Sequence, residues 1–253
     1  MKAIILAAGK GERMGFETND KPKCMVSFNG RPIIDYILET LKACGIEDII
    51  IVNGYKNNVL EAYLFDKNIR FITNTDFDST NMVYTLFCAE SEMNDDLLIS
   101  YADIIYKKEV LQGLLKNDND FVVTVDKNWK EIWRLRMNDP LKDAETMKID
   151  DIGNIIELGK QPISYNQIEG QYIGLCKISN SVMGSIRKFY HKLDKTILYD
   201  GKDYYNMYMT SFIQLIIENL LPVRADIING GWLEFDSEKD INCYKRNKLL
   251  IDN

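Results

Sequence analysis

A glycine-containing turn near the start of the chain is the first place where residue types and spacing could do chemistry. Gly9, Gly11 and Arg13 directly follow Ala3–Leu6, an apolar run typical of a strand buried on both faces. Glycines allow positive φ angles, so backbone N–H groups can come close to a phosphate, and an arginine can donate two hydrogen bonds to phosphate oxygens. The turn indicates a site for a nucleoside triphosphate, although Gly-x-Gly alone also fits an ordinary strand-to-helix turn.

A lysine behind a proline strengthens this interpretation. Pro22 fixes the backbone ahead of Lys23, and a lysine supplies a compact charge suited to an α-phosphate and its leaving group. Two other phosphate-binding loops do not fit. The dinucleotide fingerprint would need a glycine where Met14 stands, and no Gly-Lys-Ser/Thr ending of a Walker loop follows the turn.

Two acidic residues, far apart in the sequence, each follow a short apolar run. Asp103 comes after Leu97–Ser100, and Asp236 comes after Leu233–Phe235. Ligands bind beyond the carboxyl ends of strands in open α/β sheets, and carboxylates there can hold Mg2+, which prefers oxygen ligands. Either residue alone could be a helix cap or a solvated carboxylate. Asp236, at the end of a later strand, is a candidate partner for Asp103.

The pattern of apolar residues predicts the elements that must position these side chains. In the first half, buried runs alternate with helical patterns, which indicates right-handed crossovers and a parallel, doubly wound sheet. In the second half, Gly153-Asn154 signals a hairpin, and no Pro/Gly-rich linker separates the halves, so we expect one α/β domain over 1–253. The expected strands are 3–6, 49–52, 71–72, 97–100, 121–125, 147–149, 155–158, 172–178, 223–228 and 233–235, and the expected helices are 32–45, 59–64, 82–89, 110–115, 181–190, 206–219 and 238–250.

Composition and charge argue against several classes of protein. The net charge of -7 and pI near 5.0 speak against a nucleic-acid binder, which needs a basic surface. No stretch approaches the roughly 20 apolar residues that span a bilayer. The five cysteines are odd in number and form no CxxC pair, as expected of reduced thiols in a cytoplasmic protein. The single histidine, His191, fits a surface residue near a helix end.

The turn and the lysine together resemble the signature of the sugar-nucleotide pyrophosphorylase (NTP transferase) family, whose core is Rossmann-like. Leu6–Arg13 matches L-A-A-G-x-G-x-R, and Pro22-Lys23 matches its P-K. Where the family often continues L-x-P-L-T, the segment Met14–Thr18 keeps only the threonine. The resemblance implies a doubly wound mixed sheet with a small acceptor-binding insertion. It also implies Mg2+-dependent transfer of a nucleoside monophosphate from an NTP to a phosphorylated acceptor, with release of pyrophosphate.

The resemblance assigns roles to particular residues. Arg13 and Lys23 become the catalytic residues, and Asp103 and Asp236 the ligands of Mg2+. Because the acceptor phosphate already carries an oxyanion, positioning and charge neutralisation suffice, and no protein nucleophile is needed. The expected nucleotide contacts are Leu6, Ala7, Ala8, Gly9, Gly11, Glu12, Asn74, Thr80, Asn81 and Ala102. Asn74, Thr80 and Asn81 could equally cap a helix that begins at Met82.

Longer stretches narrow the resemblance to cytidylyltransferases that act on glutamine phosphate and, less closely, on phosphocholine. These stretches are Thr80–Val83, Ile99–Ile104, Val125–Trp129, Asp143–Thr146 and Asn206–Phe212. They imply the reaction of CTP with L-glutamine phosphate to CDP-L-glutamine and pyrophosphate, in capsular phosphoramidate synthesis. Residues 1–126 would then mainly bind the nucleotide, 127–235 the acceptor, and 236–253 would form a C-terminal helix.

The acceptor contacts expected from this resemblance are Lys127, Trp129, Arg134, Arg136, Glu157, Lys160 and Gln171. The basic residues among them could bind an α-carboxylate, while Asp143 or Glu145 could meet an amine. Trp129 and Trp133 could cage a choline cation or form a packing pair under a surface hairpin. The Glu157–Lys160 segment resembles a Glu-Lys motif, and Gln171 stands where sugar-specific enzymes carry asparagine.

Three alternatives stay open at this point. The acceptor could be phosphocholine or a sugar 1-phosphate. The protein could also sense an NTP without chemistry, although it keeps Lys23, Asp103 and Asp236. We expect CTP and a small phosphorylated acceptor as partners, no nucleic acid and no membrane. A homo-oligomer stays open.

Overall fold

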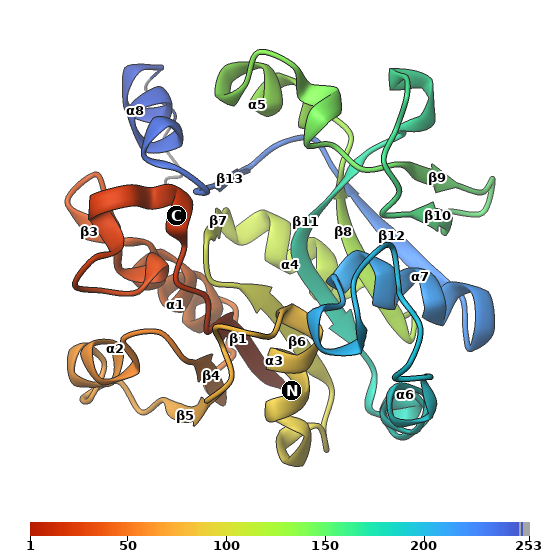
Figure 1. The fold of residues 1–253 in the computed structure, drawn as a ribbon, viewed down its shortest axis with the longest axis horizontal. Coiled ribbons are helices and arrows are strands. Elements are labelled where there is room, and N and C mark those ends of the chain that lie inside the picture. The colour runs from red at the N-terminus through yellow and green to blue at the C-terminus, as the bar shows by residue number, and fades with distance from the viewer. Residues whose placement is uncertain (248, 250–253) are drawn as a thin grey trace.

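A nine-stranded mixed sheet runs through the molecule in the order β5-β4-β1-β6-β11-β8-β12-β10-β9, with helices on both faces (Figure 1). The computed structural model describes residues 1–247 and 249. The strands of the sheet are β1 (Lys2–Ala7), β4 (Ile49–Asn53), β5 (Arg70–Thr73), β6 (Leu97–Tyr101), β8 (Phe121–Asp126), β9 (Met147–Ile149), β10 (Asn154–Leu158), β11 (Gln171–Ile178) and β12 (Val223–Ile228). Two small ladders pair β2 (Ser27–Phe28) with β3 (Arg31–Pro32) and β7 (Ile104–Tyr106) with β13 (Trp232–Glu234).

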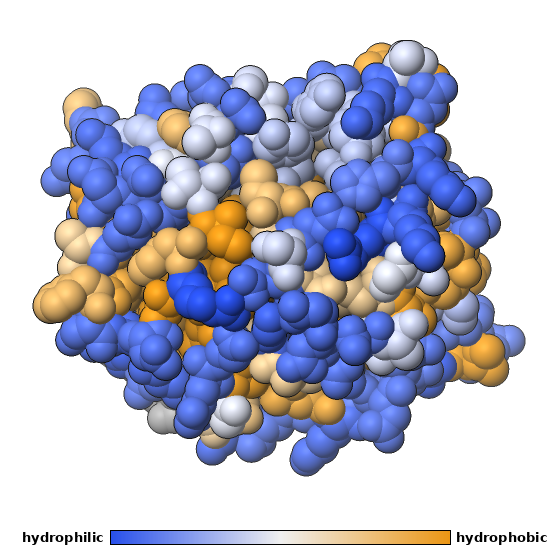
Figure 2. Space-filling model, turned by 90° about the horizontal axis from the view of Figure 1, so that it is seen from below, coloured by the Kyte–Doolittle hydropathy of each residue, from blue (hydrophilic) through white to orange (hydrophobic). Residues whose placement is uncertain are grey.

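Eight α-helices are found among the described residues. They are α1 (Ile33–Ala43), α2 (Asn57–Tyr63), α3 (Met82–Cys88), α4 (Lys108–Lys116), α5 (Trp129–Arg136), α6 (Asn180–Lys192), α7 (Met209–Asn219) and α8 (Glu238–Arg246). Within the part of the chain that the structure describes, no helix has the length and apolar character needed to cross a membrane. The surface in Figure 2 is mostly hydrophilic, with apolar side chains gathered in smaller groups.

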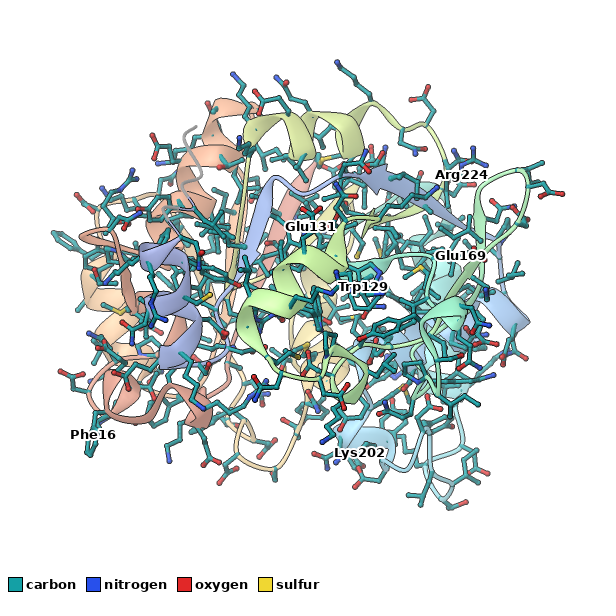
Figure 3. All side chains as sticks on the ribbon, turned by 90° about the horizontal axis from the view of Figure 1, so that it is seen from above. Phe16, Trp129, Glu131, Glu169, Lys202 and Arg224 are labelled. Atoms are coloured by element: carbon teal, nitrogen blue, oxygen red, sulfur yellow. The ribbon has the colours of Figure 1, made fainter. Side chains whose placement is uncertain are left out.

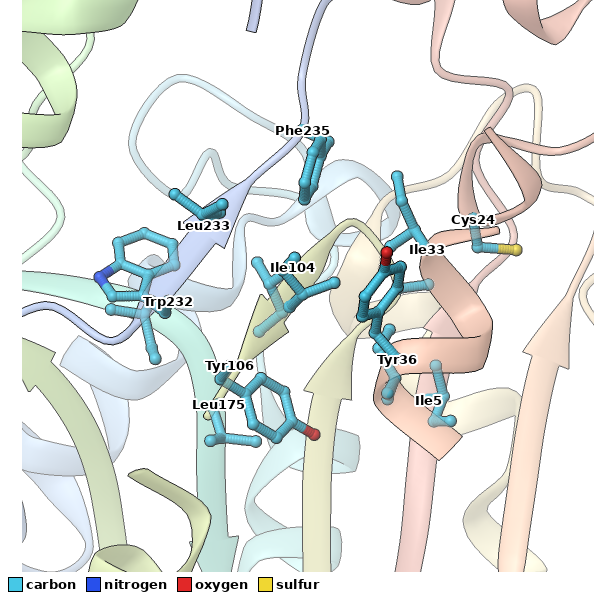
Figure 4. Close-up of a cluster of buried hydrophobic side chains, with 14 of the residues drawn as sticks. Ile5, Cys24, Ile33, Tyr36, Ile104, Tyr106, Leu175, Trp232, Leu233 and Phe235 are labelled. Carbon is cyan, nitrogen blue, oxygen red and sulfur yellow. The ribbon is translucent and has the colours of Figure 1, made fainter. Parts of the chain in front are cut away.

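Alternation along the buried strands builds two cores, one on each face of the sheet. In β1, Ala3 and Ile5 join the core that holds the apolar faces of α1 and α4, whereas Ile4 and Leu6 join the core under α3, α6 and α7. Figure 4 shows part of the first core, where Tyr106 and the residues around it pack beneath β13. A strand covered on both faces must be apolar throughout, which explains the continuous runs in the sequence.

The predicted α/β fold with a doubly wound mixed sheet is confirmed, and the predicted strands and helices are present with ends shifted by a few residues. The sheet is less regular than simple alternation indicated, because β11 lies between β6 and β8 and is antiparallel to both. The hairpin around Gly153 is β9–β10. The C-terminal helix ends at Arg246, and residues 248 and 250–253 of the predicted segment lie outside the described residues.

The segment around Trp129 and Trp133, which one alternative described as a surface hairpin over the two tryptophans, is not a hairpin. It is the helix α5, whose buried residues Trp129, Ile132 and Trp133 follow helical spacing. The two indole rings meet edge to face with centroids 5.7 Å apart. The pair therefore packs, as one of the alternatives held, but on a helix.

Candidate active site

A cleft of about 580 Å3 opens at the carboxyl ends of β1 and β6. Its lining comes from both halves of the chain. The turn after β1, Lys23 and Asp103 come from the first half, and Glu145, Thr210 and Asp236 from the second. This is the edge at which open α/β sheets bind ligands.

Lys23 lies across the glycine turn. Gly11 has a left-handed backbone (φ 69°, ψ 50°), and a Cβ added there would lie 2.8 Å from Lys23 Cβ and 2.9 Å from its Cγ. The missing side chain at Gly11 is therefore what lets the lysine cross the turn. Pro22 precedes it with φ −70° and directs the chain into a short 3-10 turn at Lys23–Met25.

Gly11→Ala should lower kcat/KM about 10- to 100-fold, because the added methyl displaces the Lys23 side chain and small misplacements at a reacting centre cost about that much. The positive φ adds strain at the same position. Pyrophosphate release with saturating nucleotide measures the effect. Gly184→Ala, in α6, is the matched control, since an added Cβ there meets no described heavy atom within 4 Å beyond its own helix. Activity of Gly11→Ala within twofold of the wild type would contradict this account.

The loop that departs from the common family form is a kinked 3-10 segment, Glu12–Thr18. Met14 is fully buried, and Thr18 Oγ1 donates to the Gly11 carbonyl at 3.3 Å, so both ends of the loop are tied to the core and the turn. Phe16, by contrast, is 89% exposed and projects at the edge of the molecule (Figure 3). The kink lies at Gly15, which has φ 56°.

The β7–β13 ladder brings the two predicted aspartates together. Ile104 pairs with Glu234, and the Phe235 N–H donates to the Asp103 carbonyl at 2.9 Å. Asp103 precedes one strand of this antiparallel pair, and Asp236 follows the other, so the register places both carboxylates at one end of the ladder. The three residue pairs of this ladder thus bring together two aspartates that are far apart in the sequence.

Lys23 binds both carboxylates. Its Nζ lies 2.5 Å from Asp103 Oδ2 and 2.8 Å from Asp236 Oδ1. Burial alone would lower the pKa of Lys23, but the two carboxylates outweigh burial and raise this pKa above its usual range. Burial likewise favours the neutral form of Asp236, yet Lys23, Arg13 and Arg136 hold its pKa well below the usual value. The resting arrangement therefore places the Lys23 ammonium between the carboxyl groups of Asp103 and Asp236.

The donor set fits a divalent cation shared with phosphates. Asp103 Oδ1 is buried and has no hydrogen-bond partner among the described residues. In that same part of the chain, no group of three or more His, Cys, Asp or Glu side chains lies close enough to hold a metal by itself. Two carboxylates without further protein ligands suit Mg2+, which keeps waters and takes phosphate oxygens to complete its shell.

A family model of the MobA-like NTP transferase domain matches residues 3–164, well over half of the chain and including the turn, Lys23 and Asp103. The chain belongs to this NTP transferase family. It is therefore a nucleotidyltransferase, as the resemblance in the sequence implied.

Two curated relatives and one solved structure resemble this NTP transferase along different lengths. A CTP:phosphoglutamine cytidylyltransferase of Campylobacter jejuni is 46% identical over 95% of this chain and 98% of that protein. A choline-phosphate cytidylyltransferase of Streptococcus pneumoniae is 38% identical over 47% of this chain and 49% of that one. The structure of a CTP:phosphocholine cytidylyltransferase from Streptococcus pneumoniae superposes with a TM-score of 0.74, at 22% identity and 98% coverage of both chains.

Most predicted nucleotide contacts of the NTP transferase line the cleft. These are Leu6, Ala7, Ala8, Gly9, Gly11, Thr80, Asn81 and Ala102, together with Arg13 and Lys23. Glu12 is exposed on the outer side of the turn and does not line it. Asn81 also serves as the N-cap of α3, where its Oδ1 accepts from Met82 N at 2.8 Å. This residue therefore both lines the cleft and caps the helix.

Asn74 lies behind the cleft wall rather than on it. It is fully buried, its amide donates to Thr80 Oγ1 and Thr85 Oγ1 at 3.0 Å each, and its Oδ1 accepts from Asp76 N. Both amide hydrogens are therefore used within the protein. This corrects the expectation that Asn74 contacts the base, because the residue instead fixes the loop that carries Thr80.

The predicted acceptor contacts fare differently, and only Gln171 lines the cleft. Its side chain clamps the backbone of Glu145, accepting from Glu145 N at 2.9 Å and donating to Glu145 O at 2.6 Å. Of the others, Lys127 and Arg134 are exposed, Trp129 is 3% exposed on the buried face of α5, and Arg136 is buried among carboxylates. Glu157, in β10, and Lys160, which follows that strand, pair with each other at 3.9 Å. The cleft therefore offers no direct contact for these six residues.

The cleft contains other side chains beyond the expected nucleotide, metal and acceptor contacts. Among them are Trp133, Lys142, Asp143, Glu145, Tyr172, Tyr208 and Thr210, of which the sequence had raised Trp133, Asp143 and Glu145 only as alternatives for the acceptor. Two of the stretches with family resemblance, Asp143–Thr146 and Asn206–Phe212, contain four of them, so the signal was present in the sequence. For Tyr208 and Thr210 this signal was not used, because the spatial position of the stretch that leads into α7 is defined only by the fold.

Proposed function

We propose that the protein transfers CMP from CTP to L-glutamine phosphate, giving CDP-L-glutamine and pyrophosphate. The observation that carries this proposal is the 46% identity with a phosphoglutamine cytidylyltransferase, which extends over the acceptor half as well as the nucleotide half. The product would serve capsular phosphoramidate synthesis, and the enzyme would act in the cytoplasm. Residues 127–235 would form the acceptor-binding part of a single nucleotidyltransferase domain.

The proposed step is an in-line displacement at the α-phosphorus. An oxygen of the acceptor phosphate attacks, a new P–O bond forms, and the bond to the β-phosphate oxygen breaks with pyrophosphate leaving. Lys23 and Arg13 neutralise charge on the triphosphate, and the backbone of the Gly9–Arg13 turn holds the leaving group. Mg2+ held by Asp103 and Asp236 would neutralise the phosphate oxygens further. Because the acceptor supplies its own oxyanion, no side chain has to act as a base.

The acceptor would occupy the part of the cleft between α5 and α7. Glu145 and Asp143 offer negative charge there, and Lys142 offers positive charge. Thr210 Oγ1 donates to Glu145 Oε1 at 3.1 Å, and Asp143 accepts from Trp133 Nε1 at 2.9 Å, so both carboxylates are held in place. Both signs of charge within one pocket suit the ammonium and carboxylate of an amino acid better than a neutral sugar.

Glu145→Gln should raise the KM for glutamine phosphate about 30-fold with a smaller effect on kcat, because a charge-assisted contact with the acceptor ammonium contributes about 2 kcal/mol. Burial raises the pKa of Glu145 to about 7. The carboxylate form therefore grows as pH rises from about 6 to 8, and the acceptor KM of the wild type should fall over that interval relative to the variant. Glu131→Gln, on the exposed side of α5 (Figure 3), is the matched control. An unchanged KM in Glu145→Gln would place the ammonium elsewhere.

Pyrophosphate release with each NTP and each candidate acceptor tests the function itself. We expect turnover with CTP and glutamine phosphate at a kcat/KM well above that with phosphocholine or glucose 1-phosphate. Absence of turnover with glutamine phosphate, with activity on phosphocholine, would replace the first acceptor by the second. Binding of CTP without turnover of any acceptor would favour a nucleotide sensor.

A further inference from the structure

Arg136 occupies a position that acceptor binding does not explain. It ends α5, and its side chain is only 2% exposed. Its guanidinium binds three carboxylates: Nη1 that of Glu234, Nη2 the Oδ2 of Asp236 at 2.8 Å, and Nε the Oδ1 of Asp240 at 3.1 Å. A rigid fork with five donors suits this arrangement, whereas a lysine could not reach all three partners at once.

The contacts around Asp236 fix both of its oxygens. Arg136 takes Oδ2, and Lys23 and Arg13 take Oδ1 at 2.8 and 3.1 Å. The backbone is fixed as well, because Asp236 N and Ser237 N both donate to Asp240 Oδ2, at 2.9 and 2.8 Å. Asp240 is in turn held by Arg136. One oxygen of Asp236 is thus turned away from the cleft, and the other is presented to it.

We propose that Arg136 is a positioning residue that presents Asp236 Oδ1 to the divalent cation on the triphosphate. The inference rests on the proposed cation-dependent transfer, and it replaces the expectation that Arg136 binds the acceptor. Without Arg136 the Asp236 Oδ2 loses the contact that holds it away from the cleft, and Glu234 and Asp240 lose their shared partner. Partners that orient a ligand without touching the metal typically change metal affinity about 10- to 100-fold when removed.

Through Arg136, the helix α5 also connects the two sides of the cleft. The helix packs against α8, and its Trp133 lines the cleft beside Glu145 and Asp143. The Trp133 ring also meets the Trp232 ring of β13 at 6.0 Å. One helix of the second half therefore carries a side chain into the acceptor side of the cleft and another to the aspartate at the triphosphate side.

The experiment compares wild type, Arg136→Lys and Arg136→Met. Mn2+ binding to each protein with the non-hydrolysable analogue α,β-methylene CTP is measured by electron paramagnetic resonance, and the Mg2+ concentration at half-maximal activity is measured separately. We expect Arg136→Met to weaken Mn2+ binding about 10- to 100-fold and Arg136→Lys about tenfold, with binding of the analogue in EDTA changed less than about threefold. Arg70→Met is the matched control, because Arg70 also binds two carboxylates, Asp48 and Glu92, but on β5.

The outcomes separate this inference from the proposed function. A wild type that does not turn over CTP with glutamine phosphate would remove the proposed function, whereas turnover that does not depend on a divalent cation would overturn the inference. A cation-dependent wild type whose folded Arg136→Lys variant binds Mn2+ within twofold would overturn the role of Arg136 alone. If Arg136→Met does not fold, Mn2+ binding to Arg136→Lys and Asp240→Asn tests the inference instead, since each of these variants keeps part of the hydrogen-bond network around Asp236. Weakened analogue binding in EDTA to the same extent as Mn2+ binding would also overturn the inference, because it indicates general damage.

Discussion

Lys23→Met should reduce kcat about a thousandfold, the largest effect that we expect from one substitution. The Lys23 ammonium is the group that bridges Asp103 and Asp236, and the alkyl chain that carries it lies directly against the turn that would hold the triphosphate. A fixed positive charge at the developing negative charge of a transition state typically contributes about 3–4 kcal/mol in a site of restricted water access. Single-turnover formation of the CDP product measures this loss directly.

The same variant should not require more Mg2+ than the wild type. The ammonium shares the two carboxylates with any cation that binds there, so its removal leaves Asp103 and Asp236 more available. A large fall in kcat with unchanged or tighter cation binding would therefore identify Lys23 as a charge on the reacting phosphates. Lys21→Met is the matched control on the other side of Pro22, because among the described residues Lys21 forms an ion pair only with Glu17, at 3.7 Å. Retention of a tenth or more of wild-type kcat in Lys23→Met would refute the proposed role.

Asp103→Asn and Asp236→Asn should each lower kcat/KM about 100- to 1,000-fold and weaken Mn2+ binding in parallel. An amide keeps the shape of the side chain but loses the charge that a hard cation prefers. Since both residues are proposed to share one cation, the double variant should lose little more than either single one. Steady-state kinetics over a range of Mg2+ concentrations, with Mn2+ binding as a second readout, test this.

Asp96→Asn is the control for this pair, because Asp96 precedes β6 at the end opposite to Asp103 and binds the backbone of Asn180. Its activity should stay within about twofold of the wild type. Losses that add fully in the double variant would indicate that the two aspartates act independently. A normal Mn2+ affinity in both single variants would remove the proposed cation site.

Local features of the site were predictable from the sequence, and features that depend on topology were not. The turn at Gly9–Arg13 and the strand before it follow from residue type and spacing alone. The proximity of Asp103 and Asp236 was inferred from resemblance, and the structure supplies its cause in the β7–β13 register. Their roles, like those of Arg13 and Lys23, stay predictions until the variants are measured.

The acceptor side was the least predictable part. Arg136 and Trp129 have residue types common in binding sites, yet Arg136 is buried among carboxylates and Trp129 packs against Trp133 on the buried face of α5. Burial depends on which elements meet in space, and a single stretch of sequence does not carry that information. Glu145 lies in a loop without periodicity, and only its clamp by Gln171 reveals that its position is fixed.

The position of β11 has a consequence for biosynthesis. Its residues, Gln171–Ile178, pair with β6 on one side and β8 on the other, so both of those strands keep an open edge until the ribosome has released the chain beyond Ile178. Unpaired edges of buried strands expose backbone N–H and C=O groups that can pair with other chains and promote aggregation. We therefore expect nascent chains stalled before this point to need chaperone protection, and the nucleotide half to mature together with its partner half instead of ahead of it.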